Sequence, residues 1–230
     1  MYRTGRRGFT LVEMAVTLAI LVALAALAFD ALQHATPRAT FNGVSAEMQS
    51  LIHQARQQAL AEGLPVAVMV FPNYPNPNGT NGRIIVVQDD TQTALSLFNT
   101  GAALNFSTYN PAVTATTPNG VLVTTLDLPR NVTVGPTTGL GQPTLPFPYN
   151  NIAVNVACSF CNGGGDNRGA IVFDYRGRTT FYNAAGAPLP GLSGGSFSIY
   201  TTQLGTSAVF SSTTFVITSP FGSIMSFQNG

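Results

Sequence analysis

One acidic residue, Glu13, lies within the longest apolar run of the chain, where a charge needs a specific partner. The run extends over residues 9–29 and holds no other charged side chain. At about 1.5 Å per residue, a helix of this length spans roughly 30 Å, which is the thickness of the hydrocarbon core of a bilayer. Acids within membrane helices are rare and usually functional, so we expect Glu13 to meet a cationic group.

A chain end four residues before Glu13 would provide that cation. Residues 1–8 form a short leader with basic but no acidic side chains. Cleavage between Gly8 and Phe9 creates an amine at Phe9, about one helical turn from Glu13. In an assembly, the carboxylate of one subunit can then meet the N-terminal ammonium of its neighbour. Removing one partner of such a buried pair is strongly destabilising.

Three alternative assignments of this segment stay open. An ordinary secretory signal has an apolar stretch of about 7–15 residues before a small-residue cleavage site, which residues 26–28 would imitate. The pair Arg6 and Arg7 is also a feature of twin-arginine signals. A plain membrane anchor is the third, and none of the three accounts for Glu13. The basic residues before the run place its start on the cytoplasmic side of the membrane.

The segment G-F-T-L-V-E, residues 8–13, resembles the class III signal of type IV pilins and type II secretion pseudopilins. The resemblance implies a prepilin peptidase that cuts after Gly8, N-methylation of Phe9, and a role of Glu13 in subunit assembly. It also implies other pilins of the same filament and an inner-membrane assembly platform as partners. The chain would be a single-pass inner-membrane protein before assembly, and then part of a periplasmic or cell-surface filament.

The composition restricts the function of the remaining chain. Of its 230 residues 45% are hydrophobic and only 8% are charged, against about a quarter in ordinary soluble domains. Without the leader, seven Arg face nine Asp and Glu, a net side-chain charge of −2. The chain has two His and two Cys, and it offers no nucleophile–base pair. We therefore expect no enzyme, no catalytic residue, no metal and no cofactor.

A second helical pattern covers residues 38–62. Polar side chains occupy one face, and apolar side chains recur on the other at three- and four-residue spacing. The apolar positions are Phe41, Val44, Met48, Leu51, Ile52, Ala55 and Ala59. Gly63 followed by Pro65 is a typical helix end.

These patterns predict an α+β fold with a long N-terminal helix on an antiparallel β-sheet or sandwich. The helix would be bent near Pro37 and consist of a membrane or filament-core half, 9–29, and an amphipathic half, 30–62. A β-rich head, 63–230, follows, with short β-prone runs between turn residues. The predicted strands are 66–71, 83–88, 121–128, 132–134, 152–157, 170–175, 178–183, 196–201 and 208–218.

Two further segments resemble the H-type minor pseudopilins, the GspH/FimT-like group. Residues 55–70 resemble their junction between helix and first strand, and residues 169–182 resemble a strand–turn–strand with an F-D-x-R-G-R core. With the N-terminus, these segments cover well under half of the chain.

Cys158 and Cys161 form a C-x-x-C motif in a Gly-rich segment. A redox pair would need a βαβ unit, and a zinc site would need a second pair of ligands. Outside the cytoplasm a local disulfide is the natural outcome, while free thiols stay an alternative.

Arg168, Arg176 and Arg178 are the only clustered basic residues of the mature head. They can contact DNA phosphates, or they can pair with Asp166 and Asp174 within a hairpin, which we favour.

The function that we prefer for the whole chain is structural: a minor pilin or pseudopilin. The alternatives are a DNA-binding component of a competence pseudopilus in natural transformation, and a minor pseudopilin of type II secretion.

Overall fold

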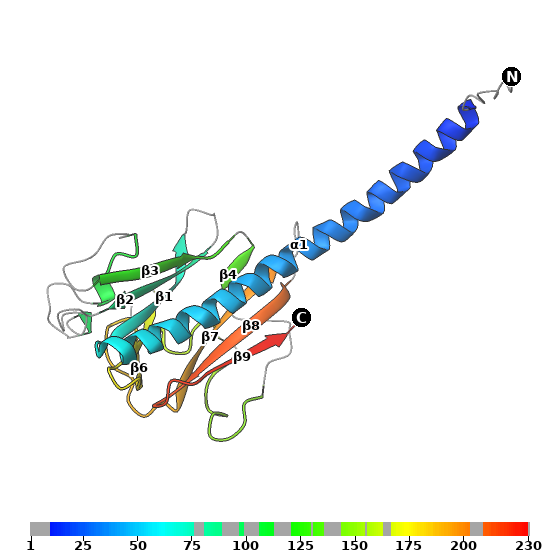
Figure 1. The fold of residues 1–230 in the computed structure, drawn as a ribbon. Coiled ribbons are helices and arrows are strands. Elements are labelled where there is room, and N and C mark those ends of the chain that lie inside the picture. Colours follow the sequence, from blue (N-terminus) through cyan, green and yellow to red (C-terminus); the bar gives the residue numbers. More distant parts are fainter. Residues whose placement is uncertain are drawn as a thin grey trace.

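The computed structural model shows one long helix whose second half packs against a head of two β-sheets (Figure 1). The first half of the helix extends away from the head, and the N-terminus lies at its far end. The structure describes residues 10–75, 81–88, 97–98, 106–112, 121–129, 131–135, 144–154, 156–162, 167–202 and 209–229.

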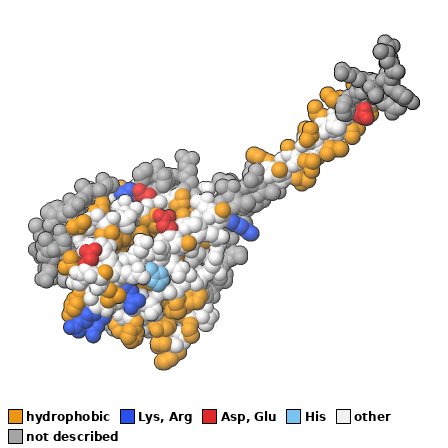
Figure 2. All heavy atoms as spheres, in the orientation of Figure 1, with side chains coloured by type: hydrophobic (Ala, Val, Ile, Leu, Met, Phe, Trp, Pro, Cys, Tyr) orange, Lys and Arg blue, Asp and Glu red, His pale blue; other side chains and the backbone are white. Residues whose placement is uncertain are grey.

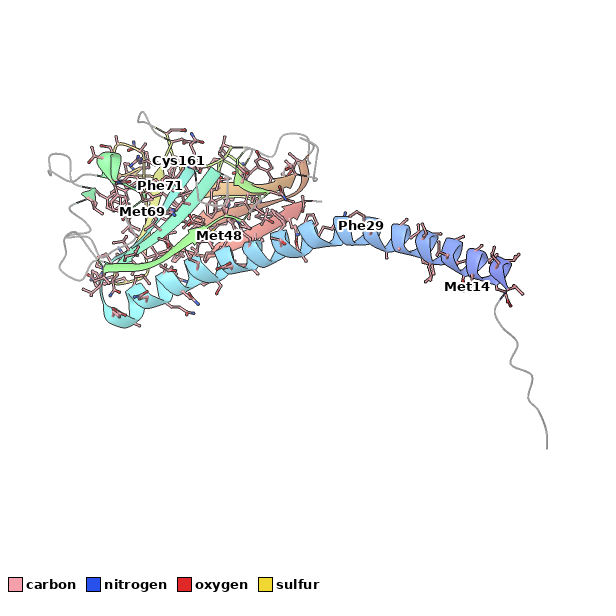
Figure 3. The ribbon with its side chains drawn as sticks, turned by 90° about the horizontal axis from the view of Figure 1, so that it is seen from above. Met14, Phe29, Met48, Met69, Phe71 and Cys161 are labelled. Atoms are coloured by element: carbon pink, nitrogen blue, oxygen red, sulfur yellow. A yellow bond between two sulfur atoms is a disulfide. The ribbon has the colours of Figure 1, made fainter. Side chains whose placement is uncertain are left out.

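Helix α1, Leu11–Glu62, is continuous over 52 residues. Pro37 lies inside it, and the helix curves gently between its free half and the head (Figure 3). A proline inside a helix removes one backbone hydrogen bond and bends the helix axis. The prediction of one helix is confirmed, since neither Pro37 nor Gly43 interrupts it.

Gly63 ends the helix as predicted. Its backbone has φ 68° and ψ 19°, in the left-handed region, and its N–H donates to the carbonyl of Ala59. A side chain at this position would be strained, so a glycine is the favoured residue for this helix end. Pro65 then leads the chain directly into the first strand.

Nine described strands form two antiparallel sheets, which confirms the α+β prediction. The five-stranded sheet has the order β3-β2-β1-β5-β6, from Val121–Asp127, Asn81–Gln88, Val66–Pro75, Gly169–Phe173 and Thr179–Tyr182. The four-stranded sheet has the order β4-β7-β8-β9, from Val132–Val134, Gly194–Thr202, Val209–Thr218 and Ile224–Asn229.

Two strand predictions differ from the structure. The predicted strand over residues 152–157 is wrong, because its described residues form bends and irregular backbone. This segment contacts β7 through a single bridge between Cys158 and Phe197 and through the Ser196 hydroxyl, which donates to the carbonyl of Ala153. Strand β9 was not predicted, and it pairs with β8 over six residue pairs.

The main core lies between the second half of α1 and both sheets. All seven apolar helix positions named above are buried, together with phenylalanines from β5, β6, β7 and β8. Burying one large apolar side chain contributes about 1.5–3 kcal/mol. The head therefore holds the second half of the helix firmly and leaves the first half free.

A second core covers the opposite face of the five-stranded sheet. Leu97, Phe98, Phe106 and Tyr109 pack there against β1, β2 and β5. Strand β1 is consequently buried on both faces from Val66 to Phe71, which accounts for its unbroken apolar sequence.

The close packing of Gly195 in β7 gives a stability prediction. A Cβ atom at Gly195 would lie 2.6 Å from the Phe181 ring and 2.8 Å from the Phe160 ring. The Gly195→Ala variant should lose about 1–3 kcal/mol of unfolding free energy through overpacking. Urea titration of the detergent-extracted protein, followed by tyrosine fluorescence, measures this change.

Gly43 provides the control. It is exposed in α1, and no atom lies within 4 Å of its added Cβ. Gly43→Ala should stabilise the protein by up to about 1 kcal/mol through helix propensity. Equal effects of both substitutions would contradict the packing of Gly195.

Candidate assembly site

The first turn of α1 holds Glu13 against the start of its own helix. Gly8 and Phe9 lie outside the described residues, so the predicted cleavage and methylation positions stay predictions. Thr10 is the N-cap residue, with extended backbone angles of φ −79° and ψ 151°. Glu13 is three residues further on, which is the spacing of a capping box.

All four groups of this capping box are bonded. The N–H and the hydroxyl of Thr10 each donate to Oε2 of Glu13 at 3.0 Å, and the N–H of Glu13 donates to the Thr10 hydroxyl oxygen at 3.3 Å. The positive end of the helix dipole also favours a carboxylate at this place. Within a single chain, the Glu13 carboxylate therefore accepts only from neutral groups, the backbone N–H and the hydroxyl of Thr10.

The residues after this turn form an apolar helix without contacts to the head. Leu11–Phe29 comprises 19 residues with a mean hydropathy of 2.5, and it is long and apolar enough to cross a membrane. Its large apolar side chains are 52–86% exposed on all sides of the helix. Figure 3 shows Met14 and Phe29 on this free half. An apolar surface of this extent needs a membrane or protein neighbours.

Thr17 is a further polar residue of the apolar helix, and its hydroxyl is satisfied locally. It donates to the carbonyl of Met14 at 3.0 Å. A threonine bonded in this way to its own helix is tolerated in an apolar environment. Thr17 therefore needs no external partner, whereas Glu13, which carries a charge, would be stabilised by a cation from outside its own helix.

Cys158 and Cys161 form a disulfide bond that is buried beside the main core. Phe160 between them packs against Phe181, with ring centroids 5.2 Å apart. Gly169 lies directly beside the pair, since a Cβ there would be 2.8 Å from Sγ of Cys161. This setting gives the disulfide a structural role, and in the described residues no group of His, Cys, Asp or Glu side chains forms a metal centre.

The structure does not bring the three predicted arginines together. Arg168 is buried, and its Nη1 donates to the carbonyls of Phe106 at 3.1 Å and Tyr109 at 2.7 Å. Arg176 and Arg178 are exposed in the turn after β5, at the other end of that strand. Arg168 thus fixes the segment that covers the second core, and only the other two arginines share a surface.

An ion pair between the buried Arg83 and the partly exposed Asp127 was not predicted. Nε and Nη2 of Arg83 donate to the two carboxylate oxygens at 2.6 and 2.7 Å, and Nη1 donates to the carbonyl of Pro111 at 2.7 Å. The hydrogen bond to Asp127 raises the pKa of Arg83, so the guanidinium stays charged. The two residues are 44 positions apart, and no local sequence pattern indicates their contact.

Comparison with known proteins identifies one match. A family model described as the prokaryotic N-terminal methylation motif matches residues 3–29. This range includes the three arginines of the leader, Gly8, Phe9, Glu13 and the apolar helix. No curated protein and no solved structure matches the chain.

The capping box gives a prediction for the first turn. The Thr10→Val variant loses the hydroxyl that both donates to and accepts from Glu13, so the turn should open more readily. We expect amide hydrogen exchange in residues 11–14 to be about fivefold faster, the effect of losing a typical N-cap side chain. Exchange of the mature protein in detergent micelles, read by mass spectrometry, measures it.

Thr17→Val is the matched control, because it removes a hydroxyl from the same helix without touching the capping box. Exchange in residues 11–14 should stay unchanged in this variant. If both variants exchange at the native rate, the hydroxyl of Thr10 does not hold the helix start.

Proposed function

We propose that this chain, a prepilin-like protein with the N-terminal methylation motif of type IV pilins and pseudopilins, is a structural subunit of a type IV pilus-like filament. The observation that carries the proposal is the division of α1. Its motif-bearing first half is apolar and exposed on all sides, while the second half buries one apolar face against the head. The pilin family consists of structural proteins rather than enzymes, which agrees with a role in assembly.

The apolar half of α1 serves two environments in turn. An N-terminal hydrophobic helix fits an inner-membrane prepilin that is later assembled into a filament. In the membrane, lipid covers the side chains of Leu11–Phe29, and in the filament the helices of neighbouring subunits cover them. Both states keep this surface out of water, so the subunit moves from one to the other without exposing it.

Glu13 changes its partner during this move. Before assembly it accepts hydrogen bonds from Thr10, which is neutral. After cleavage behind Gly8, the ammonium of Phe9 on a neighbouring subunit becomes available. A charge–charge contact in an apolar bundle is far stronger than the same contact in water. The exchange therefore favours the filament and sets the axial position of one helix against the next.

The finer assignment to the H-type, GspH/FimT-like, minor pseudopilins rests on two segments. The first segment, residues 55–70, resembles the junction between helix and first strand in that group, and it covers the end of α1, Gly63 and the start of β1. The second segment, residues 169–182, resembles the strand–turn–strand of that group, and it covers β5, the turn between Asp174 and Gly177, and β6. This arrangement supports a minor pilin or pseudopilin. A role in DNA uptake has less support, because Arg168 is buried away from Arg176 and Arg178.

Substitution of Glu13 in cells that assemble the filament tests the function. Native protein in sheared filaments should lack residues 1–8 and carry one methyl group on Phe9, as read by intact mass. Glu13→Gln keeps an oxygen that accepts from Thr10 but removes the charge. We expect this variant to reach native levels in the membrane and to fall at least about tenfold in the filament fraction, because the ammonium loses its partner.

Two further variants serve as controls. Glu62→Gln makes the same change at the other end of α1, where the side chain is exposed, and it should assemble normally. Gly8→Val should block cleavage and leave the full-length chain in the membrane. Normal assembly of Glu13→Gln, or filaments that contain residues 1–8, would contradict the proposed function.

A further inference from the structure

Three of the four described edge strands are protected against pairing with another chain. The outer edge of β6 is covered, because the N–H of Leu189 donates to the carbonyl of Phe181 and Pro188 forms a bridge to Tyr182. Strand β3 is irregular where its register with β2 shifts, and β4 is only three residues long. Covered, irregular and short edges resist the addition of a further strand. The fourth edge strand, β9, has six residues without a proline or a charge.

The open side of β9 presents backbone donors and acceptors. The N–H of Thr218 donates to the carbonyl of Ser223 at 2.9 Å, which makes these two residues the first bonded pair between β8 and β9. Bonded and non-bonded pairs alternate along antiparallel strands, so the N–H and C=O groups of Ile224, Ser226 and Gln228 point away from β8. None of these groups bonds to another backbone group of the described residues. Ser226 and Gln228 are exposed, so another chain can reach this edge.

Strand β9 runs beside α1 toward the end of the head from which the free half of the helix extends (Figure 1). The side-chain amide of Gln228 donates to the side-chain oxygen of Asn42 at 2.7 Å, and the hydroxyl of Ser226 donates to that of Gln49 at 3.5 Å. These contacts fix β9 to the helix by its side chains and leave its backbone edge open. A neighbour that packs along the apolar helix therefore continues directly onto this edge.

An apolar cluster borders the same edge on the face of the sheet that is turned away from α1. Met225 and Phe227 alternate with the residues that contact α1, and they pack in this cluster together with Tyr149. The N–H of Tyr149 donates to the carbonyl of Pro146 at 2.8 Å and closes a turn. Phe147 in this turn has a proline on either side and is 88% exposed, more than any other large apolar side chain among the described residues. An exposed aromatic side chain on a turn restricted by prolines is a suitable anchor for a protein interface.

The chemistry of the open edge indicates which kind of partner it fits. The three outward residues each offer one donor and one acceptor, at intervals of about 6.8 Å along the strand. Another polypeptide backbone in extended conformation provides matching groups at this spacing. The phosphates of a nucleic acid or a lipid only accept, so they would leave the carbonyl groups without partners. Figure 2 shows hydrophobic and neutral atoms, and no acidic ones on the described residues, below α1 where β9 lies, so an uncharged segment suits this place.

We propose that β9 binds an uncharged, extended segment of the next subunit in the filament, which adds a fifth strand to the four-stranded sheet. The backbone of this segment bonds to Ile224, Ser226 and Gln228. Every second side chain of the segment lies on the face of Met225 and Phe227, so apolar residues at these positions extend the cluster. The inference rests on the proposed function.

The strand contact complements the contact of Glu13 with a chain end. Glu13 acts at the far end of the free half of α1, whereas β9 lies where this half joins the head. A pair of neighbours held at both places has a fixed relative orientation, which one ionic contact alone does not provide. An edge that pairs with the next chain also explains why β9, unlike the other three edge strands, has no protection.

Hydrogen exchange of individual amides, read by mass spectrometry with peptide fragmentation, tests the proposal on the native protein. In the detergent-extracted mature subunit, the amides of Ser226 and Gln228 should exchange at least about tenfold faster than those of Met225 and Phe227, which bond to β8. In sheared filaments, the amides of Ser226 and Gln228 should slow down at least about tenfold, because they now donate to the added strand. The amides of Met225 and Phe227 are the internal control and should stay slow in both samples.

Ser226→Pro tests the edge by substitution. It removes one outward N–H without removing a bond to β8, and edge strands tolerate proline at such positions. In cells that assemble the filament, we expect a native level in the membrane and an about fivefold lower level in the sheared filament fraction. Ser226→Ala is the matched control, because it changes the same side chain but keeps the N–H, and it should assemble normally.

Phe147→Ser tests the exposed aromatic side chain next to this edge. The variant should fold normally, because Phe147 is exposed, and its level in the filament fraction should fall about threefold. Tyr175→Ser is the control. It makes a similar change at an aromatic side chain that is 52% exposed in the turn between β5 and β6, and it should assemble normally.

Three results would overturn the proposal. The first is fast exchange of Ser226 and Gln228 in filaments, and the second is slow exchange of both amides in the extracted subunit, since the chain itself would then cover the edge. The third is native incorporation of Ser226→Pro. If this variant does not fold, the exchange of the native protein decides. The proposed function survives each result as long as Glu13→Gln is excluded from filaments, and it fails if Glu13→Gln assembles normally, whatever the exchange shows.

Discussion

A carboxylate at the start of an otherwise apolar helix is the constraint on which the molecule depends. The isolated chain satisfies Glu13 with hydrogen bonds from Thr10 and with the positive end of the helix dipole. None of these partners carries a full positive charge. The carboxylate is thus stable enough for the membrane, yet it gains most when a cationic chain end approaches in the same apolar environment. Under the proposed function, this difference favours the assembled state of the subunit over the membrane-bound state.

The architecture separates this chemistry from the folding of the head. The second half of α1 shares one core with both sheets, so the head fixes the helix in a single orientation. The first half makes no such contacts and projects as a free apolar helix. Curvature along the helix, which contains Pro37, gives the free half its own direction without interrupting the helix. A head with few charges and a rigid anchor is suited to side-by-side packing of many parallel helices.

Local sequence signals predicted the helix and most strands, whereas contacts between distant segments could not be predicted from the sequence. The spacing of apolar residues and Gly63 define α1 because each acts within one or two turns. Strand β9 was missed because it forms by pairing with β8, which the sequence of β9 alone does not show. Residues 152–157 have the composition of a strand, but they lack a continuous strand partner. Arg168 is near Arg176 in sequence, but strand β5 separates them. The contact of Arg56 with the β8–β9 turn joins residues more than 160 positions apart, and only the folded chain reveals it.

The most direct measurement is a cryo-electron microscopy structure of the filament at a resolution that shows side chains. The account predicts that a carboxylate oxygen of Glu13 lies within about 4 Å of the methylated nitrogen of Phe9 from a neighbouring subunit, and that its bonds to Thr10 are released or shared. If Glu13 instead still accepts only from its own Thr10, with every neighbouring chain end farther away, the partner exchange does not occur and the account is wrong.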